Sequence, residues 1–90
     1  MNVSFDFKGS IFNQKEKITL ELPEQTTLLK ALQQVCKQYP HISNLLFKDG
    51  AIRADLLIMV DQKDAKRLHL FDVPLKPNQV VTILPLAHGG

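Results

Sequence analysis

The sequence predicts an α+β fold in which a mixed sheet of four to five strands packs on one main helix. Residues 3–7 and 17–22 alternate apolar and polar side chains, as half-buried strands do. Residues 28–39 place apolar side chains at spacings of three and four, which is typical of a helix with one buried face. Residues 56–60 and 80–84 are continuous apolar runs, which favour strands covered on both faces in the middle of a sheet. With 90 residues, the chain has room for one small domain.

The first two strands are expected to form a hairpin. Their connection, residues 8–16, is longer than a tight two-residue turn, and Gly9 and Asn13 are its expected turning points. Residues 11–12 can extend either strand. The side chains expected on the buried faces are Val3, Phe5, Phe7, Ile18, Leu20 and Leu22.

The helix is predicted to begin after Thr26 or Thr27, because a threonine hydroxyl can accept a hydrogen bond from a backbone N–H of the first turn. It is predicted to end near Tyr39, because Pro40 disfavours helical geometry at the residue before it. The apolar stripe consists of Leu28, Leu29, Leu32, Val35, Cys36 and Tyr39.

The second half of the chain contains further strands. Residues 43–47 fit a helical turn or a short strand equally well, and residues 61–64 suit a hairpin turn. We expect a short edge strand at residues 66–70 and a loop at residues 72–79, which contains two prolines. If the last strand lies beside the first, the sheet grasps the helix, which is a β-grasp arrangement.

Composition excludes several classes of protein. Hydrophobic residues make up 44% and charged residues 22% of the chain, which is typical of a packed globular domain. The net charge is only +2 and the cations are scattered, so we expect no nucleic-acid partner. We expect no membrane segment and no internal disulfide, since there is one cysteine. A cytoplasmic location is expected.

The last strand leads through Pro85 into Gly89 and Gly90. Proline has no N–H to donate, so pairing is predicted to stop there. We therefore expect a β-grasp domain at residues 1–85 and a flexible tail at residues 86–90. Small residues at a chain end also fit simple disorder or a cloning remnant. A tail that enters a narrow slot fits two glycines after a core strand equally well, because glycine has no side chain to widen the backbone.

Several stretches of the chain resemble the MoaD/ThiS ubiquitin-like family, nearest to its small archaeal modifier and ubiquitin-related modifier branch. Three positions depart from the usual pattern: the turn at residues 76–79 is basic, His88 precedes the two glycines, and Asp61-Gln62 replaces a hairpin Asn-Gly. These departures concern the choice of partner. The stretches that carry the resemblance are Tyr39-Pro40, Leu46, Gly50, Arg53, Val60, Leu68, and residues 72–85 ahead of Gly89-Gly90.

The resemblance implies a carrier protein rather than an enzyme. A partner activating enzyme, using ATP and Mg²⁺, would adenylate the Gly90 carboxylate, and sulfur would then convert it to a thiocarboxylate for a sulfur-accepting synthase. Ala87, His88 and Gly89 would enter the partner's active site. The alternatives are a modifier joined to lysines through Gly90 and an interaction module with an unactivated tail. This chain itself is expected to bind no cofactor.

Other candidate sites are weaker. Leu84, Pro85, Leu86 and Phe71 can form an apolar contact for the partner, although core burial suits Leu84 and Phe71 equally well. Cys36 lies on the apolar stripe and is expected to be an inert core cysteine. The histidines, His41, His69 and His88, are too scattered for a metal site. The small basic cluster is expected to lie on a hairpin exposed to solvent; it consists of Lys63, Lys66 and Arg67.

Overall fold

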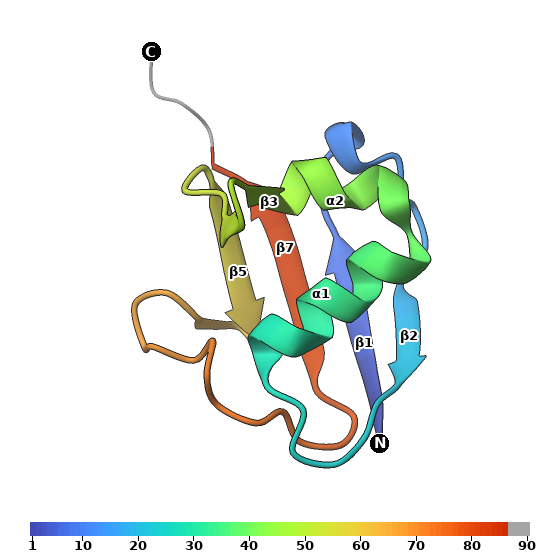
Figure 1. Cartoon of the computed structure of the whole chain (residues 1–90), viewed down its shortest axis with the longest axis vertical. Coiled ribbons are helices and arrows are strands. Elements are labelled where there is room, and N and C mark those ends of the chain that lie inside the picture. Colours follow the sequence, from blue (N-terminus) through green and yellow to red (C-terminus); the bar gives the residue numbers. More distant parts are fainter. Residues whose placement is uncertain (87–90) are drawn as a thin grey trace.

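The structure is a computed structural model that describes residues 1–86 of the chain. Two helices lie on one face of a five-stranded mixed sheet, and a two-stranded sheet lies beside them (Figure 1). The predicted β-grasp fold is confirmed. In chain order the elements are β1 (Asn2–Phe7), the 3-10 helix η1 (Ser10–Phe12), β2 (Ile18–Glu21), α1 (Leu28–Gln38), α2 (Pro40–Leu46), β3 (Phe47–Lys48), β4 (Ala51–Ile52), β5 (Leu56–Val60), β6 (Lys63–Asp64) and β7 (Val80–Pro85).

The last strand occupies the centre of the main sheet, whose order is β2-β1-β7-β5-β6. β7 runs parallel to β1, with Phe5 opposite Val81, and antiparallel to β5, with Ile58 opposite Ile83. β1 and β2 form the expected antiparallel hairpin. The predicted adjacency of the first and last strands is therefore confirmed, and it places the start of the tail at the end of a central strand.

The connection between β1 and β2 turns at the two predicted residues. Gly9 has φ 101° and Asn13 has φ 50°, both in the left-handed region. Residues 11–12 extend neither strand, since they belong to η1. There Phe12 is buried with its ring 5.1 Å from that of Phe7, while Ile11 is 53% exposed. The burial of one aromatic ring explains why the connection folds back over the core.

α1 begins and ends as predicted. The Thr27 hydroxyl accepts a hydrogen bond from the Lys30 N–H, and the helix ends at Gln38, before Tyr39-Pro40. The buried side chains of this helix are Leu28, Ala31, Leu32 and Val35. α2 is a second helix, whereas the sequence predicted one main helix. Residues 43–46, for which a helical turn and a short strand were both possible, belong to α2, and Phe47 begins β3.

The hairpin of β5 and β6 is tighter than expected. Asp61 and Gln62 alone form its turn, with φ 47° and 70°. The predicted strand at residues 66–70 is wrong, because the edge strand is β6 and the chain turns directly after it. The Asp64 carboxylate causes this turn by accepting hydrogen bonds from the N–H groups of Lys66 and Arg67 at 3.0 and 3.2 Å.

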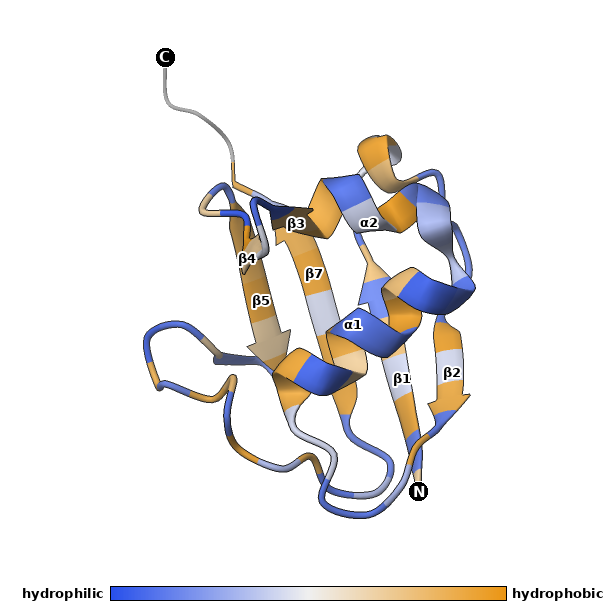
Figure 2. Cartoon of the chain, viewed as in Figure 1, coloured by the Kyte–Doolittle hydropathy of each residue, from blue (hydrophilic) through white to orange (hydrophobic). Residues whose placement is uncertain are grey.

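The core lies between the sheet and the helices, and the opposite face of the sheet has no helix over it (Figures 1 and 2). The expectation that residues 56–60 and 80–84 are covered on both faces is therefore wrong. Leu56, Ile58 and Val60 are buried, but Leu57 and Met59 between them are only half-buried. β7 alternates in the same way. A continuous apolar run does not show how many layers cover it.

Candidate functional site

The site begins where the chain leaves β7. Pro85 lies opposite Leu56, and the Leu86 N–H still donates to the Asp55 carbonyl at 2.9 Å. Pairing therefore continues one residue beyond the predicted stop, since a proline removes only its own donor. The remaining predicted tail residues, Ala87, His88, Gly89 and Gly90, lie outside the described residues.

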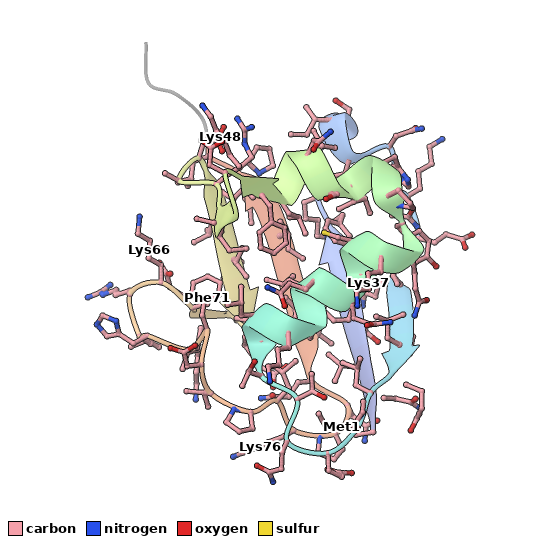
Figure 3. The ribbon with its side chains drawn as sticks, viewed as in Figure 1. Met1, Lys37, Lys48, Lys66, Phe71 and Lys76 are labelled. Carbon is pink, nitrogen blue, oxygen red and sulfur yellow. The ribbon has the colours of Figure 1, made fainter. Side chains whose placement is uncertain are left out.

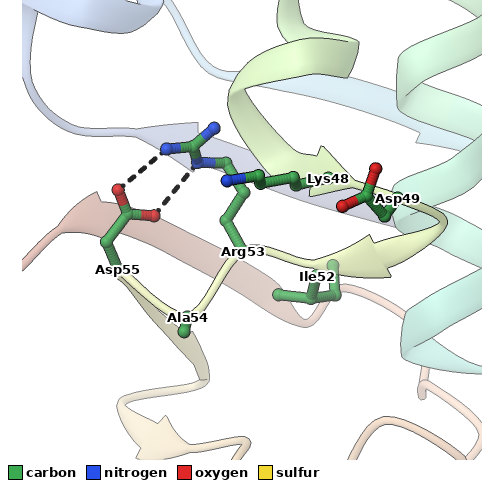
Figure 4. Close-up of a pocket in the computed structure, with 6 residues that line it drawn as sticks. All are labelled: Lys48, Asp49, Ile52, Arg53, Ala54 and Asp55. Atoms are coloured by element: carbon green, nitrogen blue, oxygen red, sulfur yellow. Dashed lines mark hydrogen bonds and ion pairs between the residues drawn. The ribbon is translucent and has the colours of Figure 1, made fainter.

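An ion pair holds the turn to which Leu86 is bonded (Figure 4). The Arg53 Nε and Nη2 atoms each donate to one carboxylate oxygen of Asp55 at 3.1 Å. This hydrogen bond and the negative charge of Asp55 raise the pKa of Arg53. The Arg53 backbone N–H donates to the carbonyl of buried Leu46 at 2.8 Å. A series of short contacts thus links the core, through Arg53 and Asp55, to the first residue of the tail.

The pair borders a shallow hollow of about 330 Å³, which Lys48 and Asp49 also line. Lys48 lies on β3 and Asp49 in the turn that follows it, so both come from the two-stranded sheet (Figures 3 and 4). The hollow is shallow, and its lining places charges of both signs beside Ile52 and Ala54. This arrangement suits a positioning role at the tail better than the binding of a small molecule.

Half-buried apolar side chains occupy the open sheet face beside the start of the tail. Leu84 lies opposite Leu57, and Thr82 opposite Met59, on β7 and β5. Directly opposed side chains of antiparallel strands touch, so these residues form one surface next to Leu86. The sequence analysis missed Leu57 and Met59. The sequence predicted one main helix, and one helix can cover only one face of a sheet. An open face could therefore have been predicted from the sequence.

The structure places the four predicted contact residues in two groups. Leu84 and Pro85 are half-buried at the end of β7, and Leu86 is 44% exposed beside them. Phe71 packs against the core, and its carbonyl accepts the Leu29 N–H at the start of α1. The labelled side chain in Figure 3 belongs to the long loop at the far end of β5. The structure therefore does not place Phe71 beside the tail.

The other candidates lie apart from the tail. Cys36 is half-buried, and burial raises the pKa of its thiol, although a hydrogen bond with Ser43 partly opposes that shift. His41 and His69 are exposed. Within residues 1–86, no three histidine, cysteine or acidic side chains are grouped as a metal site would require. Neither described helix has the length and apolar character needed to cross a membrane.

Solved structures with this fold come from archaea, eukaryotes and bacteria. SAMP1 from Haloferax volcanii superposes with a TM-score of 0.86 over 100% of both chains, at 12% identity. Urm1 from Trypanosoma brucei gives a TM-score of 0.75 at 21% identity, covering 99% of this chain and 95% of that one. A chain in the BexX/CysO complex of Amycolatopsis orientalis gives 0.73 at 21% identity, covering 98% and 99%.

The structural comparison shows the fold, and the sequence comparison shows the family. None of the curated protein sequences matches this chain. The model of the ThiS family matches residues 9–90, a range that includes the central strand β7, Arg53, Asp55 and the two terminal glycines. With nearly the whole chain matched and the β-grasp fold in place, this protein belongs to the ThiS family.

Proposed function

We propose that this protein is a sulfur carrier whose Gly90 carboxylate is activated by a partner enzyme and converted to a thiocarboxylate. The observation that carries the proposal is the Gly89-Gly90 end of a ThiS-family chain, a few residues beyond the central strand β7. Glycine has no Cβ, so such an end can pass between the walls of a narrow active site and leave its carbonyl carbon accessible.

The chemistry requires activation because a carboxylate is a poor electrophile. A Gly90 carboxylate oxygen would attack the α-phosphorus of ATP, forming the acyl adenylate and releasing pyrophosphate. Hydrosulfide would then attack the carbonyl carbon, so that a C–S bond forms, the C–O bond to AMP breaks, and AMP leaves. ATP, Mg²⁺ and the catalytic groups would belong to the partner. In this scheme the chain is a substrate, and Ala87, His88 and Gly89 are the residues that enter the partner.

The body of the protein would supply the docking surface. The half-buried face formed by Leu57, Met59 and Leu84 lies next to exposed Leu86, so a partner could cover it while receiving the tail. The relative CysO is seen in a complex with BexX, which supports a partner-bound role for this fold. A sulfur-accepting synthase would be the second partner, and the cytoplasm, where ATP is available, the expected site of action.

Conjugation to other proteins is the second candidate. It is favoured by the similarity to SAMP1, a small archaeal modifier protein, at a TM-score of 0.86. The same acyl adenylate would serve it, except that a lysine amine replaces hydrosulfide as the nucleophile and leaves an isopeptide bond. The two fates therefore share the activation step.

The test is incubation of the intact chain with an activating enzyme that adenylates ThiS-family proteins, ATP, Mg²⁺ and sulfide. We expect the mass of the chain to rise by the difference between a sulfur and an oxygen atom, localised to Gly90. Deletion of Gly90 should abolish the gain and leave the fold intact. Gly89→Val should impair it, because a branched Cβ widens the tail.

A Cys36→Ala variant is the control, because the free thiol of Cys36 is the other group of the chain that could accept sulfur. It should gain sulfur as well as the unmodified chain does. Sulfur at Cys36, or activation of the Gly90 deletion, would overturn the carrier proposal. An adenylated chain that reacts with lysine and never with sulfide would favour the modifier.

A further inference from the structure

A groove lies at the end of the sheet opposite the tail, and nothing in the proposed function uses it. It has a volume of about 190 Å³ and lies between β6 and the long loop that precedes β7. We refer to it as the loop groove. The residues that matter for its chemistry are Val60, Leu70, Val73 and Leu75, together with the charged residues Asp61, Lys63 and Lys76.

The loop groove has an apolar floor and a polar rim, and one wall is open to solvent. Val60 and Leu75 are buried in its floor, Leu70 is half-buried, and Val73 is 46% exposed. A cavity of about 150 Å³ is enough to hold benzene, so the groove can take one large apolar side chain. An exposed valine over such a hollow leaves apolar surface that a bound side chain would cover.

The wall of the loop groove is fixed in place by the backbone. The Val73 carbonyl accepts the Leu28 N–H at the start of α1, and the Leu75 N–H donates to Thr26 at 2.8 Å. The Val73 N–H donates to Leu70 at 3.0 Å. A preformed site avoids much of the ordering penalty that a loose loop would impose on binding.

The lining of the groove carries a small excess of positive charge, two lysines against Asp61. These lysines are Lys63 and Lys76. Lys66 and Arg67 lie exposed on the turn after β6 and do not line the groove, and Figure 3 shows Lys66 well away from Lys76. In the sequence Lys63 and Lys76 belong to two separate features, which the fold brings to one groove. Among the described residues, no carboxylate lies within ion-pair distance of the head groups of these two lysines.

The nearby carboxylates are largely engaged with the protein itself. Asp61 accepts hydrogen bonds from the Val80 N–H and from Gln79, and Asp64 accepts two backbone N–H groups. Asp72, which is exposed, is the remaining acid of the loop. The hydrogen bonds to Asp61 come from neutral donors, so Asp61 keeps its charge, but they hold its carboxylate against Gln79 and the Val80 N–H. The ammonium groups of the two lysines that line the groove then favour an anionic ligand.

We propose that the loop groove docks a segment of a partner protein in which one large apolar side chain is flanked by aspartate or glutamate. The apolar side chain fills the hollow beside Val73, and the flanking carboxylates pair with Lys63 and Lys76. β7 runs from the groove to the tail, and its six residues span about 20 Å. The segment can therefore bind while the tail is in another protein, and this contact does not depend on activation of Gly90.

The test is selection of random displayed peptides on the intact chain, followed by affinity measurement with the enriched peptides. We expect enrichment of an apolar residue flanked by acids, with chemical-shift changes at Leu70, Val73 and Lys76. Val73→Asp should weaken binding by at least about tenfold, as loss of a central apolar contact does. Lys63→Glu combined with Lys76→Glu should do the same and reduce the dependence of affinity on salt.

Matched controls separate the groove from general surface effects. Ile11→Asp places the same charge at an equally exposed apolar side chain on η1, and Lys15→Glu reverses a distant charge. Both should bind as the original chain does. Failure to enrich any peptide overturns the proposal. So does enrichment of peptides without acids, or binding insensitive to Val73→Asp, which would indicate electrostatic association only.

Discussion

Asp61 and Val80 exchange two hydrogen bonds across the end of the main sheet. The Asp61 backbone N–H donates to the Val80 carbonyl, and the Val80 N–H donates to the Asp61 carboxylate, both at 2.9 Å. A second oxygen of that carboxylate accepts from Gln79 at 3.1 Å. One side chain in the turn of the β5–β6 hairpin thus fixes the start of the central strand, although the two residues are 19 positions apart in the sequence.

Asp61→Ala should destabilise the domain by about 0.5–1.5 kcal/mol, because it removes the acceptor of the Val80 N–H at a site that water can reach. Alanine is also strained at the left-handed φ of 47° found there. Asp61→Asn is the matched control, since it keeps an acceptor oxygen and tolerates this backbone conformation. Chemical denaturation measures both, and equal losses for the two variants would contradict the proposed role of the acceptor.

Gln62→Gly should stabilise the protein by about 0.5–1 kcal/mol, since the gain from relieving a left-handed residue exceeds the entropic penalty of glycine. Gln62 has φ 70° as the second residue of a two-residue hairpin turn, a position that favours glycine. A raised melting temperature with unchanged spectra is the expected result. A lowered melting temperature would show that the Gln62 side chain stabilises the fold by more than its left-handed backbone destabilises it.

Gly9→Ala should destabilise the protein more than Gly50→Ala. Both glycines have left-handed backbones, with φ 101° and 81°. A Cβ at Gly9 would lie 3.0 Å from the Pro85 side chain, whereas nothing lies within 4 Å of one at Gly50. The difference between the two melting temperatures measures how much the contact between the first turn and Pro85 contributes. Equal decreases would mean that backbone strain alone causes both losses of stability.

Arg53→Ala should speed hydrogen exchange of the Leu86 amide by about fivefold, which corresponds to weakening of a single hydrogen bond. The Arg53–Asp55 ion pair holds the turn whose carbonyl accepts that amide at 2.9 Å. Lys48→Ala, which removes a neighbouring cation of the same hollow, should leave the exchange rate unchanged. Exchange at Ile83, in mid-strand, is the internal reference.

Cys36 should react more slowly with alkylating reagents in the folded chain than in the unfolded chain at mildly alkaline pH. Burial raises the pKa of the thiol in the folded state above its ordinary value of 9.0, so less of the reactive thiolate is present. Because the raised pKa belongs to the folded state, the associated stability is complete below pH 9 and is lost as pH rises through the folded value. Equal rates in both states would contradict this shift.

The sequence determined those features that depend on local patterns. Alternation identified the buried faces of β1 and β2, and the spacing of Leu28, Leu32 and Val35 identified that of α1. Thr27, Tyr39-Pro40, Gly9 and Asn13 set the helix ends and the first turn, because capping and backbone φ act within a few residues. The terminal glycines and the stretch before them also indicated the family without any coordinates.

The tertiary structure alone decided which apolar residues face solvent and which distant residues meet. Leu57 and Met59 belong to a run that reads as buried, yet they lie on an open face because both helices pack on the other side of the sheet. Asp61 reaches Val80, Arg53 anchors the turn at Leu86, and Lys63 and Lys76 share one groove. Periodicity reports the geometry of one element, whereas burial and long-range contacts depend on where every other element lies.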